Sequence, residues 1–134
     1  MAQEDKELLL KDLSARLSYE VVVNMDKQFD MIPSAIDVVS GEVWDYMHEN
    51  GYSLEQFDIK PYLRPMSSMT EEEEEEFKQV IELELKHLES EELGHTIISA
   101  ASSAFEIDFY NKHHFDYRGL IPMGLALKAP DGMY

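Results

Sequence analysis

Apolar residues recur at three- and four-residue spacing in two long stretches, and this spacing predicts amphipathic helices. In residues 4–17 four leucines fall on one helical face: Leu9, Leu10, Leu13 and Leu17. In residues 71–89 the apolar stripe consists of Phe77, Val80, Ile81, Leu85 and Leu88. A third helix is expected over residues 103–114, capped by Ser102 or Ser103. Residues 95–101 are read as a short helix or a connector, after a break at residues 90–94.

The helix over residues 71–89 has a sequence signal at its start. Thr70 is followed three residues later by Glu73, which together form a capping box. The glutamates of the 71–76 run lie where the helix dipole is positive, so part of this charge is favourable. We read the rest as a solvated face, and keep Glu71, Glu72 and Glu73 as candidate contacts for a partner.

Alternating and β-branched residues predict strands in the first half. Residues 19–25 alternate around a triple valine, and shorter strands are expected at 29–32, 35–39 and 43–48. The connecting turns are expected at residues 26–28, 40–41 and 50–51, the last being an Asn-Gly pair. The competing interpretation for residues 42–49 is a short helix with Gly51 near its C-cap.

Two prolines, Pro61 and Pro65, exclude a helix from residues 58–65, which should run extended at a sheet edge or as a crossing segment. A final short strand is expected at 125–127. Strands come mostly first and helices mostly later, so we predict one α+β domain over residues 1–134. A small antiparallel sheet would pack against two or three helices, including those over 71–89 and 103–114.

The composition narrows the function. The 134 residues carry 28 acidic and 11 basic side chains, for a formal net charge of −17, which disfavours direct contact with nucleic acid or an anionic membrane. No cysteine is present, so disulfides and thiolate chemistry are excluded. No apolar run approaches the roughly 20 residues that cross a bilayer. We therefore expect a soluble cytoplasmic protein.

Four segments carry a family resemblance: LLKDLSARL at residues 9–17, IKPYLRPMSSMT at 59–70, HHFDYRGLI at 113–121 and GLAL at 124–127. Their order and spacing resemble a family of short uncharacterised proteins of gut anaerobes and of their phages and mobile elements. The motifs cover about a third of the chain. Members tend to have proline and glycine in place of Ser18 and Glu20, and tryptophan in place of Phe109. The resemblance implies a genome-mobility setting and no particular chemistry.

The segment from His113 to Arg118 concentrates chemistry-bearing side chains. His113, His114 and Asp116 are candidates for a metal site or an acid–base pair, with His95 or Asp108 joining from elsewhere. Adjacent histidines on a helix point about 100° apart and the chain has no His-Glu-x-x-His pattern, so no cofactor is predicted. The structural interpretation places the histidines at a helix C-terminus. Asp116 would then bond turn amides, and Arg118 would pair with it.

Two other features have a structural and a functional interpretation. Trp44 and Tyr46 would share a strand face, either buried or anchoring a partner. The segment from Lys60 to Pro65 lacks the spacing of a polyproline ligand and reads as a crossover.

Two functions follow from these observations. The leading hypothesis is a non-catalytic interaction or accessory protein that binds an unknown protein partner in a bacterial or phage setting. The alternative is a small metal-assisted or acid–base enzyme centred on His113, His114 and Asp116. The sequence does not specify the partner, the substrate or the oligomeric state.

Overall fold

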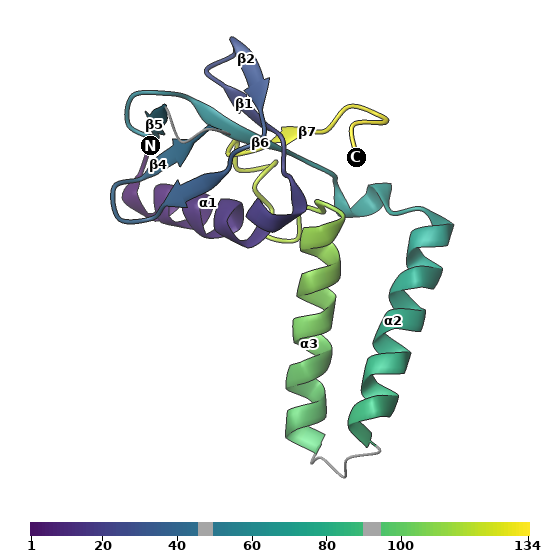
Figure 1. Cartoon of the computed structure of the whole chain (residues 1–134). Coiled ribbons are helices and arrows are strands. Elements are labelled where there is room, and N and C mark those ends of the chain that lie inside the picture. Colours follow the sequence, from purple (N-terminus) through teal and green to yellow (C-terminus); the bar gives the residue numbers. More distant parts are fainter. Residues whose placement is uncertain (46–49, 90–94) are drawn as a thin grey trace.

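The leucine stripe near the start of the chain folds as predicted, into the helix α1 over Gln3–Arg16. A computed structural model describes residues 1–45, 50–89 and 95–134; for residues 84–89 and 95–103 it describes the helical backbone only. Two further helices, α2 (Glu71–Glu89) and α3 (His95–Lys112), form an antiparallel hairpin that extends away from the rest of the molecule (Figure 1). We call this pair the hairpin and the remainder the body.

The body contains two small sheets, which confirms the α+β class. The strands are β1 (Val23–Met25), β2 (Phe29–Met31), β3 (Ala35–Asp37), β4 (Glu42–Trp44), β5 (Gly51–Ser53), β6 (Ile59–Leu63) and β7 (Leu127–Lys128). The first sheet has the order β2-β1-β6-β7 and the second the order β3-β4-β5. All pairings are antiparallel except β6 with β7, which is parallel and brings in the expected C-terminal strand.

Two of the predicted turns are confirmed. Residues 26–28 join β1 to β2, and Asp26 and Lys27 take the positive φ angles that a tight hairpin needs. The turn at 40–41 joins β3 to β4, so the helix alternative for residues 42–49 is wrong for 42–45. Residues 46–49 lie outside the described residues.

Asn50-Gly51 does not form the expected two-residue turn, because Gly51 is already in β5, opposite Trp44. A Cβ atom added to Gly51 would lie 2.8 Å from carbon atoms of the Trp44 ring, so the indole occupies the space above the glycine. A glycine in a strand often marks such a close approach.

The predicted strand over residues 19–25 is too long at its start. Leu17–Tyr19 forms a 3₁₀ turn, η1, and Glu20 takes the left-handed conformation at φ 57°. This residue redirects the chain from α1 toward β1, which begins only at Val23 because its partner β6 lies beside it there.

The proline-containing segment lies inside its sheet, between β1 and β7, and the expectation of an edge position is wrong. Tyr62 N–H donates to Val22 O at 2.9 Å, so the neighbouring Pro61 turns its backbone toward the opposite side. On that side β7 pairs only with Tyr62 and Leu63. The missing N–H of Pro61 therefore costs no hydrogen bond to β1.

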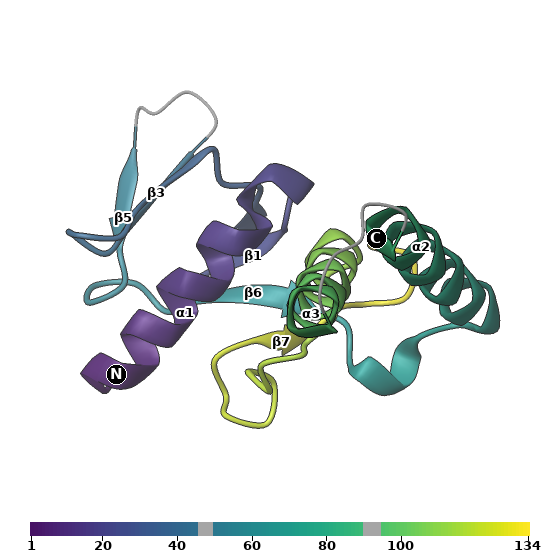
Figure 2. The same ribbon diagram turned by 90° about the horizontal axis from the view of Figure 1, so that it is seen from below.

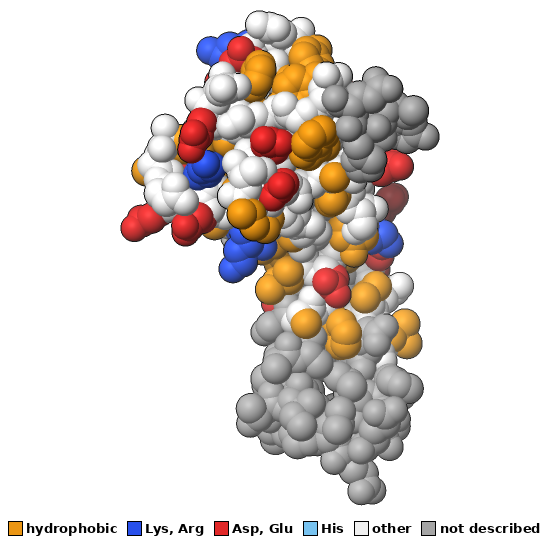
Figure 3. All heavy atoms as spheres, turned by 60° about the vertical axis from the view of Figure 1, so that its left-hand side comes forward, with side chains coloured by type: hydrophobic (Ala, Val, Ile, Leu, Met, Phe, Trp, Pro, Cys, Tyr) orange, Lys and Arg blue, Asp and Glu red, His pale blue; other side chains and the backbone are white. Residues whose placement is uncertain are grey.

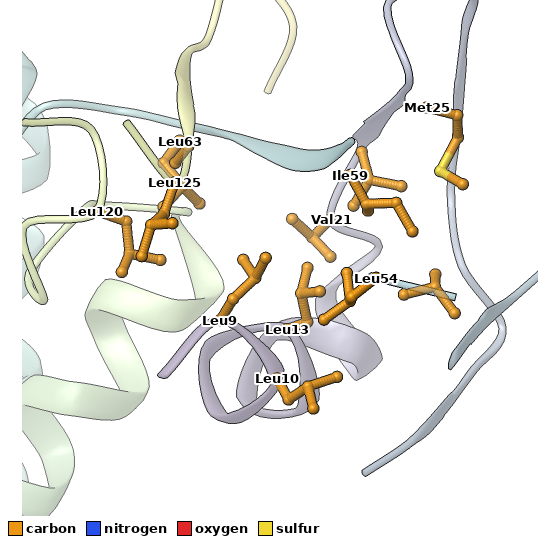
Figure 4. Close-up of a cluster of buried hydrophobic side chains, with 13 residues drawn as sticks. Leu9, Leu10, Leu13, Val21, Met25, Leu54, Ile59, Leu63, Leu120 and Leu125 are labelled. Carbon is orange, nitrogen blue, oxygen red and sulfur yellow. The ribbon is translucent and has the colours of Figure 1, made fainter. Parts of the chain in front are cut away.

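The hydrophobic core joins α1, the strands and the C-terminal segment (Figure 4). Its fully buried members include Leu9, Leu13, Val21, Val23, Ile59, Leu63 and Leu120. None of the described residues in this cluster comes from α2 or α3. The expected packing of these two helices on the sheet is therefore wrong: α1 crosses the body beside β6, and the hairpin stands next to it (Figure 2).

The helix boundaries were predicted with mixed success. α2 begins and ends as expected, and its capping box is formed: Glu73 N–H donates to Thr70 Oγ1 at 3.2 Å, and Thr70 N–H to Glu73 Oε1 at 3.1 Å. α3 begins at His95 rather than near residue 103. α2 and α3 pack against each other as antiparallel helices, and tertiary packing of this kind overrides weak helix propensity.

A buried ionic network connects α1 to the segment that follows α3. Asp12 and Arg16 are both fully buried, with Arg16 Nε 2.9 Å from Asp12 Oδ2. Asp12 Oδ1 accepts a second bond from Arg118 Nε at 3.1 Å. Arg16 Nη2 donates to the carbonyl oxygen of Phe115 at 2.5 Å. The expected pair between Arg118 and Asp116 is wrong, because Arg118 reaches Asp12.

Substitution of Asp12 tests this network. Asp12→Asn leaves two guanidinium groups facing a neutral amide, one of them fully buried, so we expect the free energy of unfolding to fall by about 3 kcal/mol. The matched control Glu7→Gln removes an exposed carboxylate from the same helix and should change stability by less than about 0.5 kcal/mol. Urea unfolding at neutral pH measures both. Equal effects of the two substitutions would contradict a structural role for the network.

Candidate functional site

The polar segment after α3 begins with a helix-ending motif. Phe115 N–H donates to Tyr110 O at 2.9 Å and His114 N–H to Asn111 O at 3.2 Å, the two bonds of a Schellman motif. His114 occupies the left-handed position, at φ 60°, that glycine usually fills. The rings of Phe115 and Tyr110 meet edge to face at 6.5 Å, as the hydrophobic contact of this motif requires.

Asp116 acts as a structural acceptor. Its two carboxylate oxygens accept the N–H groups of Leu120 at 2.7 Å and of Ile121 at 2.9 Å, which confirms the expected bonding to turn amides. Its own N–H donates to Arg64 O, and Arg64 N–H donates to His114 O, so the segment runs beside the end of β6. Both oxygens of this buried carboxylate are therefore committed to the turn.

The His114 imidazole is 4% exposed and stacks on the Tyr134 ring with centroids 3.9 Å apart. Burial, reinforced by the positive charge of Arg16, lowers its pKa to about 4. The ring is therefore neutral near pH 7. The expected interaction of a positive histidine with the helix dipole is wrong for His114, whose place at the helix end depends on backbone bonds and stacking.

Arg64, Glu73 and His113 form the second polar group. Arg64 makes a bidentate pair with Glu73, with Nη1 2.7 Å from Oε2 and Nη2 2.6 Å from Oε1. The Arg64 guanidinium also lies over the Phe115 ring at 4.3 Å. The hydrogen bonds from Arg64 lower the pKa of Glu73 to about 2. His113 lies between two carboxylates, its Nδ1 3.5 Å from Glu73 and its Nε2 3.6 Å from Glu76.

Two clefts share a wall formed by Arg64, Glu73 and Tyr134. The first, about 460 Å³, lies between the start of α2 and the last seven residues. The second, about 410 Å³, is lined by both His113 and His114. Tyr134 holds this wall in place: its hydroxyl accepts Val22 N–H at 2.9 Å and donates to Tyr62 O at 2.8 Å. Burial of that hydroxyl raises its pKa to about 12.

The candidate residues are only partly brought together. His113 and His114 reach one cleft, whereas Asp116 faces the turn at Leu120 and Asp108 lies on α3 beside a different groove. The side chain of His95 lies outside the described residues. Among the described side chains no group of three histidine or carboxylate residues is placed to hold a metal ion.

The other residues proposed to contact a partner differ in how accessible they are. Trp44 is half-buried against Gly51, and Tyr46 lies outside the described residues. Glu71 and Glu72 are exposed, whereas the carboxylate of Glu73 pairs with Arg64 and accepts the capping-box hydrogen bond. Of the glutamate candidates, Glu71 and Glu72 are therefore the ones free to meet a partner.

Comparison of the chain with protein-family models, with curated proteins and with solved structures gives no match. None of the helices in the described part of the chain is long and apolar enough to span a membrane.

Sequence reasoning missed Arg64 and Tyr134, which define the wall between the clefts. Arg64 carried no signal beyond its place before Pro65 and nine residues ahead of Glu73. Tyr134 lies in a segment that reads as a loose terminal turn, and its hydroxyl joins residues 72 and 112 positions away.

The lowered pKa of His114 predicts how stability depends on pH. In the unfolded chain the imidazole binds a proton near the ordinary histidine pKa of about 6.5. In the native state its pKa is lowered to about 4, so it stays neutral until the pH approaches that value. The contribution of His114 to the free energy of unfolding is therefore complete above pH 6.5. It declines as the pH falls, by up to about 3 kcal/mol once the pH reaches 4. His114→Asn, which tolerates positive φ, should flatten the decline between pH 6.5 and 4.5. An unchanged slope in urea unfolding would contradict this.

The lowered pKa of Glu73 predicts a separate loss of stability at lower pH. Its folded pKa of about 2 lies below the ordinary value of 4.5, so stability is present above pH 4.5 and is lost toward pH 2. Glu73→Gln should lower the free energy of unfolding by about 2–3 kcal/mol at neutral pH and weaken the acid decline. The control Glu74→Gln removes an exposed neighbour from the same run and should do neither. Similar urea midpoints for both variants would argue against the Arg64 pair.

Proposed function

We propose that the protein is a non-catalytic interaction protein and that the hairpin is the arm through which it contacts a protein partner. The observation that carries this proposal is the exposure of Val80 and Leu83 on α2, at 37% and 68%. These residues lie one helical turn apart on a helix that contacts the body only at one end (Figure 1). Apolar side chains so placed add nothing to the core of the body.

The surface of the hairpin supports this proposal. Hydrophobic side chains gather on the described part of its exposed face (Figure 3). On α3, Ile107 is 42% exposed. Apolar surface that groups together and is bordered by charge is typical of a contact site, whereas single exposed apolar residues are ordinary. Val39, which is 95% exposed in the turn between β3 and β4, is an example of the ordinary kind.

The state of the polar segment supports a non-catalytic function. Asp116 is bonded through both oxygens, His114 is buried, and Glu73 is held as a carboxylate by Arg64. A general base needs a pKa near the working pH and access to a substrate. The cluster instead fastens the end of α3, the end of β6 and the start of α2 to one another.

The proposed setting is the cytoplasm of a bacterium, with a phage or mobile element as the source that the family resemblance implies. The net charge of −17 supports a protein partner over nucleic acid, because phosphate contacts require clustered basic residues.

One observation favours the alternative, a small acid–base enzyme. His113 lies at the edge of the 410 Å³ cleft, within 3.6 Å of two carboxylates. Such an enzyme would need His113 to exchange protons with a substrate in that cleft. Replacing the wild-type protein with the His113→Gln variant in an assay of its cellular function would distinguish the two hypotheses. A contact arm at Leu83 should tolerate this change, whereas a catalytic base at position 113 should not.

The contact arm is tested by photo-crosslinking. A photoreactive residue at position 83 should crosslink one defined protein in cells that express the chain, and the same residue at position 39 should not. Purified partner and protein should then bind, and Leu83→Gln should weaken the affinity by about tenfold, as expected for the loss of one buried leucine. Equal crosslinking from positions 83 and 39 would exclude the hairpin as the contact arm.

A further inference from the structure

A groove of about 280 Å³ lies where the hairpin meets the body. α2 contributes Glu76 and Val80, α3 contributes Phe105 and Phe109, and the 3₁₀ turn contributes Tyr19. This volume lies just below the range of about 300–1,000 Å³ that is usual for small-molecule pockets. It suits one or two side chains of a protein partner rather than a complete small ligand.

The floor of the groove is apolar and fixed. Phe109 is 5% exposed, and its ring meets Phe77 of α2 edge to face at 5.0 Å. Phe77 in turn stacks on Tyr110 at 5.6 Å. Aromatic rings packed in this way hold the two helices at a constant separation, so the groove exists before a partner arrives.

The apolar surface continues beyond the groove along α2. Glu76, Val80 and Leu83 follow one another at four- and three-residue spacing and therefore share one helical face. Tyr19 and Val80, at the groove itself, are each 37% exposed, and Leu83 is 68% exposed. Together with the floor of the groove, Val80 and Leu83 form an apolar strip whose anchors lie one helical turn apart, the spacing at which an amphipathic helix presents its own apolar residues.

The rim of the groove is acidic. Glu76 and Asp108 lie on opposite helices at its edges, with Lys112 as the basic residue of the lining. Glu72 precedes Glu76 by one turn and is exposed. A partner that covers the apolar floor therefore has to bring positive charge to both sides.

We propose that this groove binds a single amphipathic helix of a partner protein, with leucine or phenylalanine anchors on one face and lysine or arginine on its flanks. This inference rests on the proposed contact arm and names the chemistry of its partner. The apolar anchors fill the space above Phe109 and cover Val80 and Leu83. The basic flanks pair with Glu72, Glu76 and Asp108, which adds orientation and association rate more than affinity.

A second copy of this chain is a poor occupant of the same groove. It would bring the same acidic rim against Glu72, Glu76 and Asp108, and like charges at close range oppose association. The net charge of −17 adds to this repulsion over the whole surface.

The test uses three synthetic peptides of about 18 residues, a length that gives five helical turns. The first is an amphipathic leucine–lysine helix, the second a scrambled sequence of the same composition, and the third the first peptide with glutamate in place of lysine. Fluorescence anisotropy with the full-length protein at physiological salt measures the affinity. We expect the first peptide to bind at least about tenfold more tightly than the second, which has equal charge, and the third not to bind.

Variants of the protein locate the contact. Val80→Gln with Leu83→Gln should weaken the first peptide by at least about tenfold, because two partner-facing apolar side chains are lost. Asp108→Asn should weaken it less and make its affinity less sensitive to salt. The control Val39→Gln removes an apolar side chain that is 95% exposed on the body and should change nothing. Circular dichroism of each variant verifies that the fold is retained.

The outcomes separate the two proposals. Equal affinity for the amphipathic and the scrambled peptide, or no effect of the Val80 and Leu83 substitutions, overturns the helix-binding groove. A crosslinked partner at position 83 that presents a strand or an acidic surface overturns it as well, while the contact arm stands. Sedimentation that shows a dimer dissociated by Leu83→Gln would assign the strip to a second copy and overturn the cationic partner.

Discussion

The fully buried guanidinium of Arg16 is the interaction on which the arrangement of this protein depends. It pairs with Asp12 on its own helix and donates to the carbonyl of Phe115, 99 residues further along the chain. Phe115 lies beside Arg64, whose own guanidinium covers the Phe115 ring and pairs with Glu73 at the start of α2. One continuous line of charged and aromatic contacts thus connects α1, the end of α3, the end of β6 and the start of α2.

This line of contacts explains how a hairpin that adds no described residue to the main hydrophobic cluster can still hold a direction. α2 and α3 contact each other through Phe77, Phe109 and Tyr110, and the last two rings also meet Phe115 of the body. The body holds both helices at one end. The Glu73 pair with Arg64 fixes the start of α2, and the Schellman motif at His114 fixes the end of α3. Burying Arg16 and Asp12 costs solvation, and buried ion pairs of this kind contribute more to a specific arrangement than to net stability in some systems. Here we infer that the arrangement they specify is the angle of the hairpin.

The sequence predicted the parts of the fold that depend on neighbouring residues. The leucine spacing of α1, the turn at 26–28 and the Thr70–Glu73 capping box each involve positions a few residues apart, where geometry follows from the pattern. The start of α3 was not predictable in this way, because the small and β-branched residues of that stretch give only a weak local helix signal. The same holds for the site: Asp116 bonding its own turn followed from local rules, whereas the pairing of Arg118 with Asp12 spans 106 residues. The Tyr134 hydroxyl, which joins Val22 just before β1 to Tyr62 of β6, belongs to a segment with no local signal.

The acidic charge and the exposed apolar strip on α2 make sense together. A helix that exposes Val80 and Leu83 with no charged residues beside them would favour self-association, because exposed apolar surfaces associate with one another. In the proposed complex, glutamates beside the strip would repel other copies of this chain and leave the apolar residues accessible to a basic partner. Under this proposal, the acidic charge at the start of α2, which the helix dipole and the capping box tolerate, would also favour basic over acidic partners at the groove. Specificity of this kind needs both an attractive floor and a repulsive rim, and the hairpin has the two on adjacent turns of the same helix.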